Sequence, residues 1–581
     1  MNQIVIAPLL VAVVAVVATL ALGRRPALQR ATSVAGAIVY AASVALLAWR
    51  VVLAPDAGPA TYQSGGWPAP FGITLVADAL SAFMLVLAAT VGLWSVAVAV
   101  RVLDRENQRV FYHPLFHCML LGVTGAFLTG DLFNLFVWFE VMLMASYVFV
   151  AFYGGAKHTA GAFRYLVPNV VGSAVMLLGI GGLYATVGTL NMADMARRLA
   201  DPAAYGIDVA PVVGLSAFVL ATFALKAGLV PFQFWVPSAY RAAPLPAAAM
   251  LAGVTKKVGI YAVIRLYFTV FAAAGLDGAT LPGTGVGITG DSPLAFLGPV
   301  LLAMAVASIA VGGVGAVGRE TVDELLAYSS IGQVGFIALP VALAASAPSG
   351  AVRRAAVAAA LVYALHHALA KGLLFLSTAT VRGATGTTRL SELGGLGQRS
   401  PVLSAAFLVG SLSLVGIPPL AGFFGKFLVF EVAARHFATV PTAAAAVPLA
   451  AALVGAVLTI VYITRTWIGG FWGTQTPQVG QATVDPVQVG LLAALAAVIL
   501  AAGVAFDPVY RFATAAAEAA LDRGAYVDLV DPAPGTTLLA AGTGAGGALG
   551  SSGGAARPDR AGERGAGTEN GNRPADGGEG T

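Results

Sequence analysis

The sequence predicts an all-α protein that crosses a membrane about fourteen times. The chain has 581 residues, of which 58% are hydrophobic and only 10% charged, and its mean hydropathy is +0.84. A soluble protein of this length needs far more charge to cover its surface. Apolar stretches long enough to cross a hydrocarbon core of about 30 Å recur along most of the chain. Two of these stretches are interrupted by proline and carry a lysine, which is typical of transport proteins.

The predicted membrane helices follow one another from the N-terminus to about residue 506. Their centres lie near residues 13, 43, 88, 121, 142, 175, 222, 258, 305, 335, 368, 415, 456 and 497. The first stretch has neither a basic segment before it nor a small-residue cleavage site, so we expect a membrane helix and not a signal peptide. After the last span, residues 508–530 are expected to form a short amphipathic helix. The Gly-rich residues 534–581 have too few large apolar side chains to bury, and we expect them to be disordered.

Composition excludes several classes of function. The net charge of +5 is scattered through short loops, without the basic stripe of a nucleic-acid-binding protein. Cys118 is the single cysteine, so this chain cannot build a disulfide or an iron–sulfur site from its own thiolates. The sequence contains no Walker loop, no CxxC and no haem-binding run. We therefore expect no cofactor and no metal site.

The distribution of basic residues predicts the orientation of the chain. Loops on one side of the membrane carry more Lys and Arg than loops on the other, and the richer side is expected to be cytoplasmic. The richer loops contain Arg24, Arg25, Arg30, Arg101, Arg105, Arg109, Lys157, Arg164, Arg241, Arg319, Arg382, Arg389 and Arg399. An even number of spans then places both termini outside the cytoplasm.

Glu140 is an acidic side chain deep inside a predicted span, in GDLFNLFVWFEVMLMASY. It follows Asp131 by nine residues, which is about 13–14 Å at 1.5 Å per residue. A charge at that depth costs about 2.5–3.5 kcal/mol on insertion scales. Glu140 could form a structural ion pair with a lysine of another helix, or it could carry a proton. The second interpretation is favoured because intramembrane acids are mostly functional, and a pair that opens could serve both purposes.

Residues 223–240, FALKAGLVPFQFWVPSAY, place Lys226 and Pro231 in one span. Proline breaks a helix, and the freed carbonyl groups need partners from protein or from a water-filled cavity. Water beside a buried lysine allows it to take up and release a proton, so we predict that Lys226 takes part in proton transfer.

Residues 411–431, SLSLVGIPPLAGFFGKFLVFE, repeat this pattern with Pro418, Pro419 and Lys426. Paired interrupted helices in corresponding halves are typical of transporters built from inverted repeats. The alternative is two kinked helices whose lysines extend to the membrane surface. That alternative requires a position near a helix end, and Lys226 lies too centrally for it.

Further titratable residues lie within other predicted spans. Lys256 and Lys257 are adjacent, so their side chains point about 100° apart and only one of them can easily face the bundle interior. His367 and Lys371 are four residues apart and share a helix face, where a histidine could bridge between lysines. His113 and His117 have the same spacing, but without a supporting carboxylate we favour a structural role over a metal site. The stretch T-x-x-E at Thr321 predicts a capping box at a helix start.

Several of these segments together resemble the antiporter-like proton-translocating subunits, a family shared by Mrp-type Na⁺/H⁺ antiporters and respiratory complex I. The resemblance covers roughly residues 75–470. It rests on GDLFNLFVWFEV, ALKAGLVPFQFWVPSAYRAAPLPAAAMLAGVTKKVGIYAVIR, LLAYSSIGQVGF, HHALAKGLLFL and GIPPLAGFFGKF. Within the family, the chain is most similar to the D-type subunits of the Mrp antiporters, because of Lys426 in the second broken helix and the ending LDRGAYVDLV. It departs from the family where Asp323 and Glu324 replace basic residues.

The resemblance implies a fold of two inverted five-helix repeats with two broken helices. The resemblance places a first antiporter-like repeat at 111–275 and a second at 290–470. Hydropathy and composition add N-terminal helices at 1–110, a last helix with an amphipathic segment at 485–530, and the tail at 534–581. The resemblance also implies proton-translocation roles. These roles fall on Glu140, Lys226, Lys257, His367, Lys371 and Lys426. Lys257 matches the family lysine better than Lys256 does. The helix breaks are at Pro231, Pro418 and Pro419.

Three functions are compatible with this pattern. The first is a proton-translocating subunit of a multisubunit Na⁺/H⁺ antiporter in the cell membrane, which is a secondary transporter and not an enzyme. Its partners would be other membrane subunits, and one of them would carry sodium because this sequence shows no oxygen-rich site for that ion. The second is a pumping subunit of a complex I-type oxidoreductase or of a membrane-bound hydrogenase. The third is a scaffold, in which neutral substitutions of the buried charges would be tolerated; their number argues against it.

Overall fold

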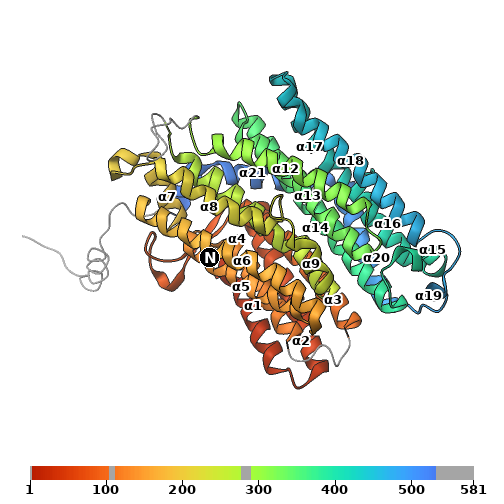
Figure 1. Cartoon of the computed structure of the whole chain (residues 1–581). Helices are drawn as coiled ribbons and strands as arrows, with labels where there is room; N and C mark the ends of the chain where they lie inside the picture. The colour runs from red at the N-terminus through yellow and green to blue at the C-terminus, as the bar shows by residue number, and fades with distance from the viewer. Residues whose placement is uncertain (1–2, 104–110, 277–289, 531–581) are drawn as a thin grey trace, which may run out of the picture. The chain divides into compact units, whose positions relative to one another are not determined.

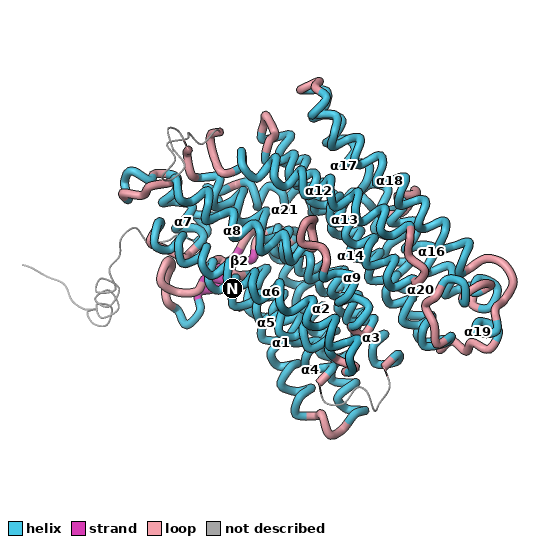
Figure 2. Tube along the Cα trace, viewed as in Figure 1, coloured by secondary structure: helices cyan, strands magenta, loops and turns pink. Residues whose placement is uncertain are grey.

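Helices make up most of the described chain in the computed structural model, which describes residues 3–103, 111–276 and 290–530 (Figures 1 and 2). Within these residues, 12 helices are long and apolar enough to cross a membrane. Two shorter apolar helices, Tyr112–Leu128 and Pro401–Val415, complete the fourteen predicted spans, and each predicted centre falls inside a helix. The predicted all-α polytopic fold is therefore confirmed. The predicted tail, 534–581, lies outside the described residues.

The N-terminal part combines three long helices with one short hairpin. Its helices are α1 (Gln3–Ala21), α2 (Pro26–Ala48), which continues as a π-helical turn (Trp49–Leu53), and α3 (Ala79–Val102). Between α2 and α3, strand β1 (Ala60–Gln63) pairs antiparallel with β2 (Thr74–Ala77), with a 3₁₀ turn (Ser64–Gly66) after β1 (Figure 2). Asp78 follows β2 directly, and its carboxylate accepts a hydrogen bond from the Ser81 N–H at 2.9 Å. An aspartate in this position satisfies a free N–H group of the first turn and so starts α3.

The first repeat contains spans 4 to 8. Its helices are α4 (Tyr112–Leu128), α5 (Leu132–Ala151), α6 (Gly155–Val187), the short α7 (Met192–Ala200) with a 3₁₀ turn (Pro202–Tyr205), α8 (Ala210–Ala227) and α9 (Trp235–Ala242). Span 8 joins α10 (Leu245–Met250), a π-helical turn (Leu251–Thr255), α11 (Lys256–Ile264), a second π-helical turn (Arg265–Val270) and a 3₁₀ turn (Phe271–Ala273). Span 8 is buried on every side.

The second repeat contains spans 9 to 13. Its helices are α12 (Leu294–Val317), α13 (Val322–Ala345), α14 (Gly350–Thr385), a 3₁₀ turn (Leu390–Glu392), α15 (Leu396–Arg399), α16 (Pro401–Val415), α17 (Ala421–Thr439) and α18 (Ala443–Gly470). The chain then continues through α19 (Pro477–Gly480), α20 (Pro486–Val504), α21 (Phe506–Leu521) and α22 (Arg523–Val530). The predicted amphipathic segment after the last span is thus two helices.

The second repeat is inverted relative to the first because each repeat has five spans, which is an odd number. Successive spans cross the membrane in alternating directions, so each span of the second repeat runs opposite to its counterpart five spans earlier. Figure 1 shows the two repeats side by side, the first in orange to yellow and the second in green to blue-green. Helix α14 packs against α10 at their junction, and α9 packs against α13. Span 8 and α14 therefore form the interface between the two halves.

Both predicted helix breaks are present, and glycine ends each helix before proline is reached. Helix α8 ends at Gly228 (φ 71°) and α16 ends at Gly416 (φ 91°), both in the left-handed conformation that glycine adopts without strain. Pro231 follows in the first connection, and Pro418 and Pro419 follow in the second. The prolines prevent the helix from continuing, whereas the glycines set where it stops.

The predicted capping box at Thr321 is wrong in its side-chain contacts, although the helix begins where expected. Thr321 precedes α13, but its hydroxyl makes no capping hydrogen bond. Glu324 instead lies 3.1 Å from Arg319 and 3.5 Å from Arg241. Asp323 lies 3.2 Å from Arg382 near the end of α14. These two acids therefore tie the start of α13 to neighbouring segments, which leaves no carboxylate for a capping box.

We expect Gly312→Ala to destabilise the protein where α12 crosses α13. A Cβ atom at Gly312 would lie 2.0 Å from the backbone nitrogen of Gly332, and backbone atoms cannot move aside as a flexible side chain can. Overpacking of this kind costs about 1–3 kcal/mol. The melting temperature in detergent should fall. Gly181→Ala is the matched control, because a Cβ there meets nothing within 4 Å; an equal effect of both substitutions would contradict the packing argument.

Candidate functional site

Glu140 lies on α5, where the sequence predicts a buried carboxylate. The start of α5 is set by Asp131, whose carboxylate accepts a hydrogen bond from the Asn134 N–H at 2.7 Å. The helix then carries Glu140 into the span, and its carboxylate accepts a short hydrogen bond from the Ser173 hydroxyl on α6. The Glu140 side chain is only half-buried. It therefore reaches the surface of this chain within a membrane span, which is an unfavourable place for a charge unless another subunit or water covers it.

Lys226 lies in the last turn of α8, directly before the break at Gly228, and is fully buried. Its Nζ donates a hydrogen bond to the Tyr165 hydroxyl at 2.8 Å. Tyr165 in turn lies 2.9 Å from the Ser146 hydroxyl of α5. The ammonium group also faces the rings of Tyr165 and Trp235, at 5.3 and 5.9 Å from their centroids. Aromatic faces and a hydroxyl stabilise a cation here. Among the described residues, no carboxylate oxygen lies within 4.0 Å of the Lys226 ammonium group.

A row of polar side chains on α6 connects Glu140 to Lys226. Tyr165, Asn169 and Ser173 are spaced by four residues, so they share one face of α6. Ser173 contacts Glu140 at one end, and Tyr165 contacts Lys226 at the other. The Asn169 side-chain oxygen between them is buried and has no partner among the described residues. The carboxylate and the lysine are thus linked through a third helix and not by direct contact.

Lys256 and Lys257 are both fully buried, so the expectation that only one faces the interior is wrong. The reason is that span 8 is surrounded by protein on every side. Lys256 Nζ donates to the Ser330 carbonyl of α13 at 3.1 Å, and a Cβ at Gly228 would lie 3.1 Å from it. Lys256 therefore lies between the first broken helix and the second repeat.

Lys257 and His367 join the two repeats directly. Lys257 Nζ lies 2.7 Å from His367 Nδ1 on α14, and it also donates to the Ala252 carbonyl at 2.7 Å. Lys371, one turn beyond His367 on the same face, donates to the Leu326 carbonyl at 2.9 Å. All of these side chains are fully buried. The structure thus brings Lys257, His367 and Lys371 into one buried cluster.

Lys426 lies in the second turn of α17, just after the second break. Its Nζ donates to the Val415 carbonyl at 3.0 Å and lies 5.5 Å from the centroid of the Phe336 ring. The two broken helices thus place their lysines differently: Lys226 precedes its break and Lys426 follows its own. In both cases the lysine is buried beside the break, where the backbone is interrupted.

His366 is a further buried residue that the sequence did not single out. Neither of its ring nitrogens has a hydrogen-bond partner among the described residues. Its ring packs edge-on against Tyr363 at 4.4 Å, and a Cβ at Gly425 would lie 3.2 Å from its Nε2. His366 therefore lies between the cluster around His367 and the helix of Lys426. The signal in the sequence was the first histidine of HHALAK, which spacing alone does not distinguish from a core residue.

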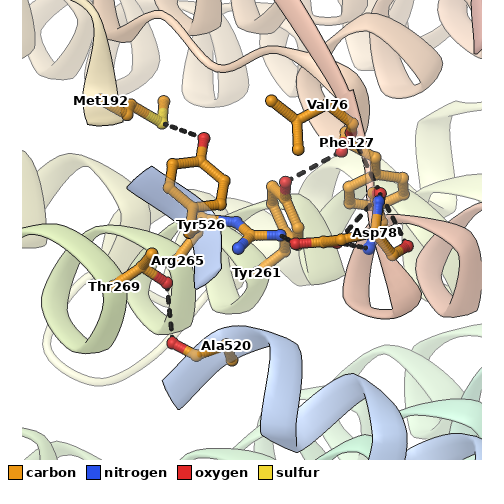
Figure 3. Close-up of polar contacts among 10 residues, drawn as sticks. Val76, Asp78, Phe127, Met192, Tyr261, Arg265, Thr269, Ala520 and Tyr526 are labelled. Carbon is orange, nitrogen blue, oxygen red and sulfur yellow. Dashed lines mark hydrogen bonds and ion pairs between the residues drawn. The ribbon is translucent and has the colours of Figure 1, made fainter. Parts of the chain in front are cut away.

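Asp78 and Arg265 form a buried ion pair that sequence analysis missed (Figure 3). Arg265 Nη2 lies 2.5 Å from Asp78 Oδ2, and their side chains are 2% and 5% exposed. Each residue lies near the end of a predicted span, where a charge is expected to reach the surface. Only the packing of α3 against span 8 shows that the two meet.

His113 and His117 are both buried on α4, and one hydroxyl bridges them. Ser33 Oγ lies 3.0 Å from His113 Nδ1 and 3.0 Å from His117 Nε2. The three side chains join α2 to α4. No group of three or more His, Cys, Asp or Glu side chains able to hold a metal ion lies within the residues described.

Comparisons with known proteins agree with this arrangement. The sequence matches the family described as NADH:quinone oxidoreductase/Mrp antiporter, TM, over residues 129–277 and 293–454. It is 33% identical to the D subunit of the Na⁺/H⁺ antiporter of Alkalihalophilus pseudofirmus over 534 residues, covering 91% of this chain and 99% of the relative. It is 35% identical to the N subunit of the NADH-quinone oxidoreductase of Desulforudis audaxviator over 459 residues, or 78% of this chain and 84% of the relative.

A solved structure shares the same architecture. A chain of the Mrp complex from a Dietzia species superposes with a TM-score of 0.73 at 27% identity, covering 91% of this chain and 100% of that one. The fold, the matched segments and the sequence identity over nearly the whole length lead to one conclusion. The chain is a multi-pass membrane protein that belongs to the NADH:quinone oxidoreductase/Mrp antiporter transmembrane family.

Proposed function

We propose that this chain is the proton-translocating subunit of a multisubunit Na⁺/H⁺ antiporter in the cell membrane. One observation carries the proposal: buried titratable side chains extend through both repeats and meet at their junction, where Lys257 contacts His367 at 2.7 Å. Buried charges are costly in a membrane, and their usual reason is ion movement. The relative from a Na⁺/H⁺ antiporter supports this assignment because the two sequences align over nearly their full lengths.

In the proposed path, Glu140 exchanges a proton at the surface of the first repeat, and the proton passes to Lys226 through water bound along the polar row of α6, where the Asn169 oxygen has no protein partner among the described residues. Lys256 and Lys257 then carry it across the junction to His367, Lys371 and finally Lys426. Each step requires a group that both binds and releases a proton, which lysine, histidine and glutamate do and arginine does not. Gly228 and Gly416 interrupt the helices beside Lys226 and Lys426, where water can reach the freed carbonyl groups.

In this proposal the chain is part of a transporter and not an enzyme, and sodium crosses through a partner subunit. The loops that carry more Lys and Arg face the cytoplasm, so both termini lie outside the cytoplasm. The five predicted segments at 1–110, 111–275, 290–470, 485–530 and 534–581 remain part of the proposal, with the last outside the described residues.

A second candidate is a pumping subunit of a redox-driven complex, favoured by the similarity to a component of an NADH-quinone oxidoreductase. The proton path within the chain would be the same, and the difference would lie in the neighbouring subunits.

Isolation of the native complex distinguishes the two candidates. The chain is tagged, membranes are solubilised in mild detergent, and the proteins that accompany it are identified by mass spectrometry. We expect several small membrane proteins without a flavin or iron–sulfur protein, and Na⁺-dependent proton movement in everted vesicles. Recovery of NADH-oxidising or hydrogenase subunits would replace the antiporter by a redox pump.

A further inference from the structure

The buried ion pair of Asp78 and Arg265 lies at the end of a row of polar side chains on span 8. Span 8 carries Lys257, Tyr261 and Arg265 at intervals of four residues, and all three are at most 2% exposed. This spacing stacks them along one helix face, with about 6 Å of rise between neighbours. The Arg265 guanidinium lies 5.8 Å from the centroid of the Tyr261 ring. The row thus leads from the junction of the two repeats to the ion pair.

Helix α22 covers this ion pair with the ring of Tyr526 (Figure 3). The Arg265 guanidinium lies 4.9 Å from the centroid of that ring, and Tyr526 is 3% exposed. Among the described residues, the Tyr526 hydroxyl reaches only the sulfur of Met192, at 4.0 Å, which is a weak contact. The adjoining end of α21 is held by a hydrogen bond from Thr269 to the Ala520 carbonyl at 2.8 Å. Tyr526 is therefore a cover that no strong polar bond holds in place.

A cleft on the outer side of this cover reaches Asp78 of the ion pair. It has a volume of about 130 Å³ and is lined by Asp78, Tyr526 and the exposed Asp522, among others. This volume is well above the roughly 10–15 Å³ that one water molecule needs. Arg265 Nη1 is buried and has no hydrogen-bond partner among the described residues. Its N–H groups therefore offer donors to water that enters from the cleft.

We infer that Asp78, Arg265 and Tyr526 form a proton-release site, a branch at which protons leave the transfer path from Lys257, before the second repeat, toward this face of the membrane. The inference rests on the proposed function and adds to it an outlet with water as its ligand. Displacement of Tyr526 lets water reach the ion pair. A proton released by Lys257 passes through this water to the Asp78 carboxylate, which lines the cleft, and leaves Asp78 as hydronium through the cleft while Arg265 stays protonated. The Arg265 cation is neutralised by Asp78, so the closed site holds no excess charge. When Tyr526 returns, the outlet closes.

We expect Tyr526→Ala to abolish the pH gradient that vesicles with the wild-type complex maintain, because the outlet then stays open. The measurement is the decay of an imposed pH gradient in everted vesicles without sodium, at matched complex levels. Tyr510→Ala is the matched control, since Tyr510 lies on α21 and is 36% exposed. The double variant Tyr526→Ala with Lys257→Met should hold the gradient again, because the leak must pass through Lys257. A leak that persists in the double variant, or a gradient held by Tyr526→Ala, overturns the inference.

A second measurement covers the case in which Tyr526→Ala does not assemble. Ala525 is exposed and lines the cleft, whereas Thr514 on α21 does not. In a Cys118→Ser background, we expect a charged thiol reagent to slow exchange in Ala525→Cys and to leave exchange in Thr514→Cys unchanged. Equal exchange by both labelled variants contradicts the inference. The leak assay tests the outlet and needs no sodium. The antiport proposal is tested separately, by the Glu140→Gln variant, so failure of one can be told from failure of the other.

Discussion

Replacing Glu140 with glutamine is expected to abolish sodium-driven proton exchange while the complex still assembles. Glutamine has nearly the same shape and still offers Ser173 an oxygen acceptor, so the contact between α5 and α6 is retained. It cannot take up or release a proton, and a positioned proton-transfer group typically contributes about 10²–10⁴-fold to a rate. The exchange rate should therefore fall by at least about 100-fold. Fluorescent measurement of the pH change on adding Na⁺ to everted vesicles gives the rate.

Asp131→Asn is the matched control for this experiment. Asp131 is an acid at the start of the same helix, but its carboxylate caps the first turn. Asparagine caps a helix as well as aspartate does, so exchange should be close to that of the wild type. Wild-type exchange by Glu140→Gln, at equal amounts of complex, would remove the carboxylate from the path.

Replacing Lys226 with arginine is expected to abolish exchange as fully as Lys226→Met does. Arginine keeps the positive charge, the donor to Tyr165 and the contact with the Trp235 ring. However, it does not deprotonate in proteins, so it cannot pass a proton on. We expect a loss of about 100-fold or more for both variants in the same vesicle assay.

The two substitutions of Lys226 separate a proton carrier from a fixed charge. If Lys226 only balanced nearby charge, Lys226→Arg would support exchange and Lys226→Met would not. Exchange by the arginine variant alone would therefore show that the proton takes another route. Immunoblots of the vesicles check that both variants reach wild-type amounts of complex, since arginine is larger than the buried lysine that it replaces.

The class of the protein and the positions of its spans could be predicted from local patterns in the sequence. Hydropathy is a local property, because each helix must satisfy its own backbone in the membrane whatever its neighbours are. For the same reason the two breaks were visible, since proline at 231, 418 and 419 disrupts a helix without help from other segments. The buried lysines and Glu140 stood out because a charge inside an apolar stretch needs no structure to be noticed.

Which of these side chains meet could be learned only from the packing of the helices. Lys257 and His367 are 110 residues apart, and their contact depends on how span 8 and α14 pack. Whether Lys256 or Lys257 faces the interior had no local answer, because span 8 is buried all round. Asp78 and Arg265 looked like charges at the membrane edge until α3 brought them together. Contacts of this kind depend on the rotation and crossing of whole helices, which the pattern of any single helix does not contain.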